Sequence, residues 1–134
     1  MRSKGSRRGL GPNYTDRTLD QVAAPYDWPA EKQFVSVDSR DSDGDILLHR
    51  AAHGGSVEDV WDLLRLGSDI NAKGDLGHTP LHYAAMAGHR SATIALLAAG
   101  ASDGLRNEWG QTPSEAADVG GHHELASTIR DHQK

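Results

Sequence analysis

The sequence has no cysteine, few aromatic residues and no long apolar run, and each absence excludes something. Without cysteine, the 134 residues can form neither a disulfide nor a thiolate metal site. No run reaches the roughly 18 apolar residues of a membrane-spanning helix, and the N-terminus does not resemble a secretory signal. We therefore expect a cytoplasmic protein that does not enter a membrane. The small aromatic share of 5% favours thin layers of small side chains over one central core.

Charge is unevenly distributed along the chain, whose net charge is −5. Four basic residues lie beside glycine and serine in the first eight positions, namely Arg2, Lys4, Arg7 and Arg8. This composition predicts a flexible basic arm over residues 1–12. Four charges are a weak indication of nucleic-acid binding, so no nucleic-acid partner is expected. Acidic residues predominate after residue 33, which favours an acidic folded region.

The sequence repeats itself with a period of 33 residues. Glycine recurs in register at two places in each repeat, and alanine and a branched aliphatic residue recur once each. The in-register sets are Gly44, Gly77 and Gly110; Gly55, Gly88 and Gly121; Ala51, Ala84 and Ala117; and Leu63, Leu96 and Ile129. A fixed period carried by several residue types indicates a solenoid, in which each unit is stable only when stacked on its neighbours.

A short motif follows the first glycine of each repeat, and it reads DGDILLHRAA, LGHTPLHYAA and WGQTPSEAAD. This motif resembles the ankyrin family, whose repeat carries G-x-T-P-L-H-x-A-A, and Thr79 to Ala85 match it without a gap. The resemblance covers residues 41–134 as three repeats, at about 41–73, 74–106 and 107–134. It implies an all-α solenoid of helix-turn-helix units with projecting loops or β-hairpin-like fingers.

Local signals agree with that architecture. Thr79 and Pro80 are suited to open a helix over 80–87, because threonine caps the first turn and proline loses no needed donor there. Gly88 is suited to end this helix, since glycine accepts a positive φ. A second helix is predicted at about 91–98, with Leu96 pointing inward.

The two ends of the solenoid are predicted to be capped differently. In the last repeat, polar residues stand where a following repeat would require apolar ones, and these are Ser114, Glu115, Asp118 and Arg130. At the other end, residues 13–40 predict an irregular N-terminal cap, with a short helix over 16–23. Tyr26, Trp28 and Phe34 are interpreted as an apolar plug over the first repeat.

Histidine suggests a metal site only weakly. His49 and His53 have the i, i+4 spacing of a helical ligand pair, but no third ligand is fixed by spacing. The resemblance instead places His49 and His82 at the TPLH position, where the imidazole bonds backbone between neighbouring loops. No phosphate loop, nucleophile elbow or cysteine nucleophile is present. We expect no metal and no cofactor, and a small metal-dependent enzyme using His49 and His53 is the remote alternative.

The resemblance implies a non-catalytic module that recognises a protein partner through its loop tips and first helices. Transferring those positions repeat by repeat gives Ser42, Asp43, Asp45, His53 and Gly54 in the first repeat, Asp75, Leu76, His78, Met86 and Ala87 in the second, and Glu108, Trp109, Gln111, Val119 and Gly120 in the third. Leu76 and Trp109 at loop tips are the expected anchors. The acidic residues are either a solvated rim that keeps the protein soluble or a surface complementary to a basic partner. Trp61 and Ile94 lie on the opposite side as a second possible contact.

At the level of architecture, the chain resembles bacterial immunity or antitoxin proteins, which hold a toxic and often basic enzyme. This predicts that it binds and inhibits a basic protein, as a monomer apart from the complex. A general adaptor or a regulatory inhibitor is the alternative, because a fold alone does not give a function.

Overall fold

The computed structural model describes residues 17–26 and 36–132, and within these ranges it contains helices and no strand. The helices are α1 (Leu19–Ala23), α2 (Leu47–Gly54), α3 (Val57–Arg65), α4 (Pro80–Met86), α5 (Arg90–Ala98), α6 (Pro113–Val119) and α7 (His123–His132), with 3-10 helices η2 (Ala24–Tyr26) and η3 (Asp75–Gly77). The all-α prediction is confirmed, and the two helices predicted in the middle repeat agree with α4 and α5 to within one residue. The predicted arm over residues 1–12, Trp28 and Phe34 lie outside the described residues.

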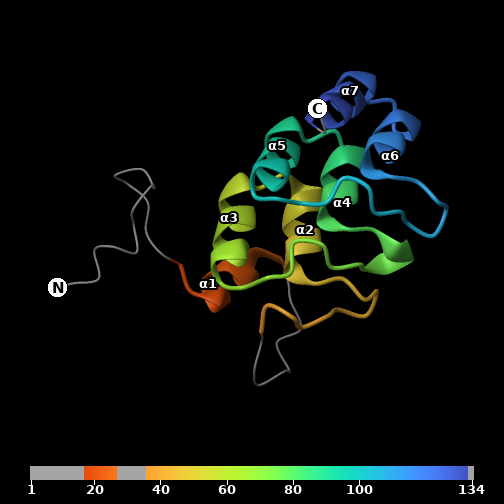
Figure 1. Ribbon diagram of the computed structural model, residues 1–134. Coiled ribbons are helices and arrows are strands. Elements are labelled where there is room, and N and C mark those ends of the chain that lie inside the picture. The colour runs from red at the N-terminus through yellow and green to blue at the C-terminus, as the bar shows by residue number, and fades with distance from the viewer. Residues whose placement is uncertain (1–16, 27–35, 133–134) are drawn as a thin grey trace, which may run out of the picture.

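The six helices of the repeats form two layers (Figure 1). Helices α2, α4 and α6 stack side by side as the first layer, and α3, α5 and α7 form the second. Each repeat contributes one helix to each layer. The loops that precede α2, α4 and α6 project beyond the first layer, so the residues at their tips lie in a row.

Small residues between the layers explain the close stacking. Two in-register sets predicted from the 33-residue period are completely buried, Ala51, Ala84 and Ala117 on the first layer and Leu63, Leu96 and Ile129 on the second. Alanine lets neighbouring helices approach, and the aliphatic residues fill the space between helix pairs. Each repeat therefore contributes one alanine and one aliphatic residue to the core. Such a core needs few aromatic residues.

The start of α4 forms the capping arrangement that its Thr-Pro sequence predicts. The Thr79 hydroxyl accepts a hydrogen bond from the backbone N–H of His82 at 3.3 Å, and His82 Nδ1 accepts one from the backbone N–H of Thr79 at 3.1 Å. Ile46 replaces the threonine before α2 and has no hydroxyl to offer. His49 Nδ1 nevertheless accepts the Ile46 N–H at 3.0 Å, so one half of the cap is kept.

The same two histidines join each repeat to the next. Because Nδ1 accepts a hydrogen bond, Nε2 carries the proton and donates it to a carbonyl in the following loop. His49 donates to Ala72 at 2.7 Å, and His82 donates to Gln111 at 2.8 Å. This confirms the backbone role that the resemblance implied. Desolvation by burial lowers the pKa of both imidazoles, that of His82 to about 4.

Helix α1 lies against α3, within the segment 16–23 that was predicted to be helical (Figure 1). Arg17 donates hydrogen bonds to Asp62 at 2.7 Å and to Asp59 at 2.5 Å, and the Tyr26 hydroxyl also donates to Asp59. Val22 is completely buried. Burial raises the pKa of Asp62, although Arg65 lies beside it. Residues 17–26 thus pack against α3 and are joined to it by a partly buried ionic cluster.

The outer surface of the last repeat is polar, as predicted, with one exception. Asp118 accepts hydrogen bonds from His123 at 2.8 Å and from Arg130 at 3.1 Å, and these bonds lower the pKa of its carboxyl. Glu115 is exposed, as expected. Ser114 is buried, its hydroxyl 3.3 Å from that of Thr112, so its placement on a solvated face was wrong. The capping hydroxyl offers it a polar neighbour in the interior.

A histidine of each of the last two repeats packs on a glycine of the repeat before it. A Cβ added at Gly88 would lie 2.5 Å from the His122 ring, and one added at Gly55 would lie 2.7 Å from the His89 ring. His122 is therefore half-buried, whereas the following His123 is exposed.

Stacking should supply most of the stability. We expect Leu96→Ala to lower the free energy of unfolding by about 2–5 kcal/mol, because it opens a cavity between two helix pairs. Ile94→Ala on the same helix is the control, since Ile94 is exposed and its loss should cost much less. Urea unfolding of the two variants measures both values. If Leu96→Ala costs no more than Ile94→Ala, the assignment of Leu96 to the core is wrong.

The packing of His122 on Gly88 can be separated from backbone strain. Gly88 and Gly121 have φ of +77° and +86°, but only Gly88 has a neighbouring ring at its Cβ position. We expect Gly121→Ala to cost about 1–2 kcal/mol through the left-handed backbone, and Gly88→Ala to cost more. Thermal unfolding of the pair provides the measurement. Equal costs would show that the His122 ring moves aside without a loss of stability.

Buried neutral histidines should make stability depend on pH. The pKa of His82 is about 4 in the folded chain, whereas an unfolded histidine titrates near 6.5. Below pH 6.5 the unfolded chain binds more protons, so stability is lost as pH falls through this window. His82 alone should lower the free energy of unfolding by about 2 kcal/mol between pH 7 and pH 5. Urea unfolding that gives the same free energy at both pH values would contradict this.

Candidate functional site

Each loop before a first-layer helix is closed by a hydrogen bond from its first N–H to a carbonyl four residues later. The pairs are Asp41 to Asp45 at 2.9 Å, Gly74 to His78 at 2.8 Å, and Asn107 to Gln111 at 2.9 Å. In the described chain these loops are tight turns without strand pairing, so the β-hairpin-like form of the fingers was not found. Their closure presents the intervening residues outward.

Side chains hold the first and last loops in the same way. Asp41 Oδ1 accepts the backbone N–H of Asp43 at 2.9 Å, and Asn107 Oδ1 accepts that of Trp109 at 3.0 Å. Burial would raise the pKa of Asp41, but hydrogen bonds from Arg50 and two backbone N–H groups lower it. The backbone of Trp109 is thus fixed before any partner arrives.

The middle loop is held from the repeat before it. Asp45 accepts hydrogen bonds from the backbone N–H of Asp75 at 2.8 Å and from the Tyr83 hydroxyl at 2.9 Å. Gly74 makes this approach possible, because a Cβ there would lie 2.2 Å from the Asp45 carboxylate. The backbone N–H of Glu108 in turn donates to the Leu76 carbonyl at 2.9 Å. These bonds tie the three loops into one row.

Two predicted binding residues are therefore part of the framework and not of the free surface. Asp45 is 8% exposed and His78 is 3% exposed. Asp45 cross-links two repeats, and the His78 ring lies 5.2 Å from the Tyr83 ring and 5.7 Å from the Trp109 ring. Burial lowers the pKa of His78 against the influence of the nearby carboxylates. Sequence position alone did not distinguish these inward positions from the outward ones beside them.

The other predicted residues are accessible. Trp109 is 62% exposed and Val119 is 74% exposed, and Leu76 is also among the large exposed hydrophobic side chains. Asp43, His53 and Glu108 are exposed, whereas Asp75, Met86 and Gln111 are half-buried. Leu76 has a φ of 55°, a conformation that costs a leucine about 1–2 kcal/mol. Nothing in the repeat motif predicts this strain.

Five of the predicted residues surround one hollow between the ends of α4 and α6, which we call the Trp109 hollow. It has a volume of about 490 Å³ and is lined by Met86, Trp109, Gln111, Ala116, Val119 and Gly120. Of these, Ala116 was not predicted as a site residue. The 33-residue register offered a signal for Ala116, because the larger Tyr83 stands one repeat earlier.

The accessible carboxylates of the loop tips have no basic partner in the described part of the chain. Asp43, Asp75 and Glu108 form no ion pair with lysine or arginine there, whereas Asp41 pairs with Arg50 at 2.7 Å. These three carboxylates give the loop edge a negative potential.

A family model described as ankyrin repeats matches residues 48–134 with three copies. The chain belongs to the ankyrin-repeat family. It is a protein-interaction module, since ankyrin repeats serve to bind other proteins. None of the curated proteins compared with the chain matches it.

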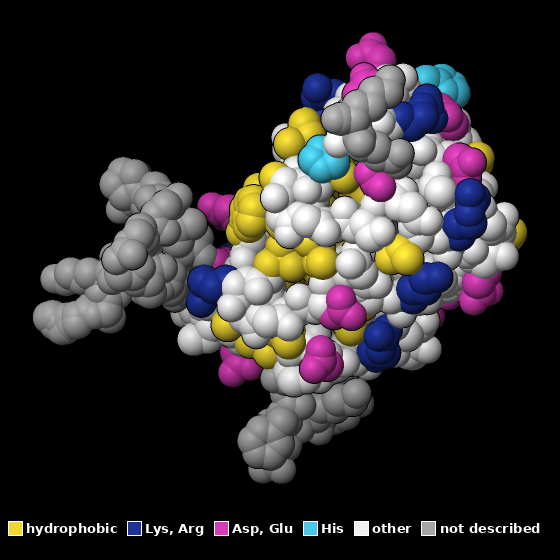
Figure 2. Space-filling model, viewed as in Figure 1, with side chains coloured by type: hydrophobic (Ala, Val, Ile, Leu, Met, Phe, Trp, Pro, Cys, Tyr) yellow, Lys and Arg dark blue, Asp and Glu magenta, His cyan; other side chains and the backbone are white. Residues whose placement is uncertain are grey.

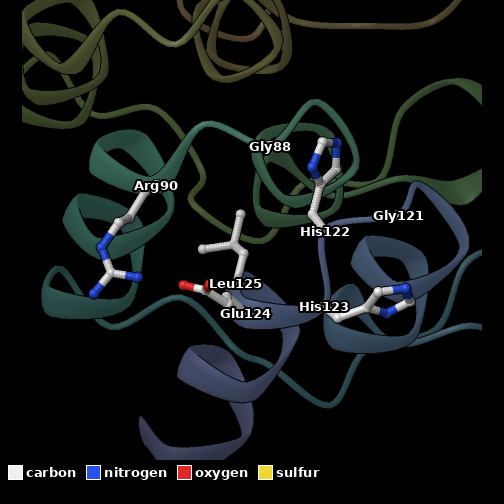
Figure 3. A pocket seen from close by; sticks show the side chains of 7 residues that line it. All are labelled: Gly88, Arg90, Gly121, His122, His123, Glu124 and Leu125. Atoms are coloured by element: carbon white, nitrogen blue, oxygen red, sulfur yellow. The ribbon is translucent and has the colours of Figure 1, made fainter.

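A second hollow of the ankyrin stack lies where α5 and α7 begin, with a volume of about 510 Å³ (Figure 3). Arg90 and Glu124 reach toward it from the two helices, while His122 points toward Gly88. Arg90 donates to the Thr128 hydroxyl at 3.2 Å and His123 is bonded to Asp118. The Arg90 contact therefore joins the second and third repeats, and the His123 contact lies within the third.

The second layer of the stack exposes apolar side chains of its own. Trp61 on α3 and Ile94 on α5 are exposed, and Figure 2 shows hydrophobic side chains at the surface over these two helices. This places Trp61 and Ile94 on the outer face, as the sequence interpretation had them. Trp61 is thus a matched counterpart to Trp109 on the opposite side of the stack.

His49, the main ligand of the hypothetical metal site, is occupied by other contacts. Both nitrogens of His49 are engaged with backbone, at 3.0 Å from the Ile46 nitrogen and 2.7 Å from the Ala72 oxygen. No group of three or more histidine or acidic residues is placed to hold a metal ion in residues 17–26 and 36–132. In the same ranges, no helix is long and apolar enough to cross a membrane.

Proposed function

We propose that the chain binds a basic protein through its loop tips and the exposed ends of its first-layer helices, and that it inhibits this partner by covering a basic surface. The partner is an enzyme or a toxin whose working surface is positively charged, as with immunity and antitoxin proteins. The observation that carries the proposal is a large apolar side chain, Trp109, held exposed beside carboxylates that lack a basic partner in the described chain.

Trp109 has the properties of an interface anchor. Its backbone is fixed by Asn107 and its ring rests against His78, so little conformational freedom is left to lose on binding. Tryptophan is enriched among the residues that dominate binding energy. Leu76 adds support, because a strained and exposed leucine at a loop tip suggests use by a partner.

The charge of the loop tips supports a basic partner. Asp43, Asp75 and Glu108 belong to successive repeats, so their negative potential extends along the whole row. Complementary potentials speed the encounter of two proteins and penalise partners of the same sign. A basic surface that lies over a catalytic cleft would be covered by such a row.

Matched tryptophan variants test the binding face. We would immobilise the full chain, Trp109→Ala and Trp61→Ala, expose each to native cell extract, and then measure the affinity of the purified bound protein. We expect Trp109→Ala to lose about 2 kcal/mol or more of binding free energy and Trp61→Ala to lose little. The bound protein should also lose its own activity in the complex. Normal affinity of Trp109→Ala, with loss in Trp61→Ala, would move the interface to the outer face.

Removing charge from the loop tips should slow association. The test variant combines Asp43→Asn, Asp75→Asn and Glu108→Gln, and leaves Asp45 in place because it holds the middle loop. The control removes the same charge elsewhere, with Asp20→Asn, Glu58→Gln and Glu124→Gln. Stopped-flow association at several salt concentrations should show a lower rate and a flatter salt dependence for the test variant only. Equal effects of both variants would show that the loop carboxylates are a solvated rim with no specific role in association.

A further inference from the structure

We infer that the Trp109 hollow receives one large apolar side chain of the partner, and that a lysine or arginine next to this side chain binds the carboxylates of Glu108 and Asp75. The inference rests on the proposed function and specifies the element recognised. It follows from why the hollow exists, from what lines it, and from the charges beside it.

The hollow exists because a small residue replaces a large one in the third repeat. Tyr83 of α4 extends over the first layer, where its ring lies 5.6 Å from that of His53 and 5.2 Å from that of His78. One repeat later the corresponding position of α6 is Ala116, whose methyl group does not fill the space that a tyrosine ring would take. The neighbours of that space, Met86 and Gln111, correspond to His53 and His78.

The lining of the hollow suits an apolar occupant. Trp109, Met86 and Val119 offer an aromatic face, a flexible thioether and an exposed isopropyl group. The one polar side chain, Gln111, already accepts a hydrogen bond from the Asn107 amide at 2.9 Å. At the base, a Cβ on Gly120 would lie 2.9 Å from the Met86 carbonyl oxygen, so glycine keeps the two helix ends close. Methionine adapts to aromatic or aliphatic groups of different shape.

Carboxylates lie beside this apolar hollow. Glu108 directly precedes Trp109, and Asp75 lies in the loop whose Leu76 carbonyl accepts the Glu108 N–H at 2.9 Å. Neither carboxylate pairs with a lysine or arginine of the described chain. The matching element is therefore a partner segment in which an aromatic or large aliphatic residue adjoins a basic one.

A short blocked peptide, Gly-Gly-Arg-Phe-Arg-Gly-Gly, is the probe, and the full chain labelled with ¹⁵N is the target. Signals of the Trp109 indole and of the backbone near Gly120 should shift on titration. Replacing phenylalanine by alanine in the peptide, or both arginines by glutamine, should weaken binding. Absence of these shifts at millimolar peptide, or shifts centred on Trp61, would overturn the inference.

Filling the hollow from within gives the sharper test. Ala116→Tyr copies the residue of the preceding repeat and should weaken peptide binding about tenfold or more, a loss typical of a blocked anchor pocket. Ser127→Tyr adds a tyrosine on exposed α7 and should change nothing. Val119→Gln makes the exposed rim polar without a change in charge or in the core, and should also weaken binding if Ala116→Tyr proves unstable. Unchanged affinity in a folded Ala116→Tyr or Val119→Gln chain would overturn the inference.

The purified partner separates this inference from the proposed function. If Trp109→Ala weakens the partner complex and Ala116→Tyr does not, the loop-tip interface stands and the hollow has no occupant. If neither variant weakens it, both ideas fail. If both weaken it to a similar degree, the hollow is occupied as inferred.

Discussion

In each of the first two repeats, one imidazole lies between the start of a first-layer helix and the loop of the next repeat. Its Nδ1 accepts a backbone N–H at the helix start and its Nε2 donates to a carbonyl in the neighbouring loop, in His49 as in His82. Such a bridge requires a neutral ring, which burial ensures by lowering the pKa. The positions of the second and third loops therefore depend on these two side chains and on Asp45.

Once the loops are fixed, the differences between repeats determine the surface. The first repeat has Arg50 where the second has Tyr83 and the third has Ala116. Arg50 pairs with Asp41, Tyr83 bonds Asp45, and Ala116 leaves a hollow beside Trp109. The same helical position thus stabilises a loop in the first repeat, joins two repeats in the second, and leaves a hollow in the third. The stack is regular in its core, and the proposed binding surface lies at its variable positions.

The sequence was sufficient to predict the architecture, because the 33-residue period places the same buried alanine and aliphatic residue in each repeat. The exposure of Trp109 and Leu76 could also be predicted, since nothing in a loop tip buries them. The burial of Asp45, His78 and Ser114 could not be predicted, because it depends on which way each side chain points and on which neighbours it contacts. Asp45 bonds Asp75 and Tyr83, the His78 ring lies beside those of Tyr83 and Trp109, and the Ser114 hydroxyl lies beside that of Thr112. The Trp109 hollow depends on an absent ring, which a motif does not reveal.

Oxidative footprinting of the tryptophans would test the central claim most directly. In the free chain, Trp109 and Trp61 are 62% and 41% exposed, so both should react with hydroxyl radicals in solution. In the complex with the purified partner, mass spectrometry should show strong protection of Trp109 and unchanged oxidation of Trp61. Protection of Trp61 with continued oxidation of Trp109 would contradict the account, because the partner would then lie on the second layer.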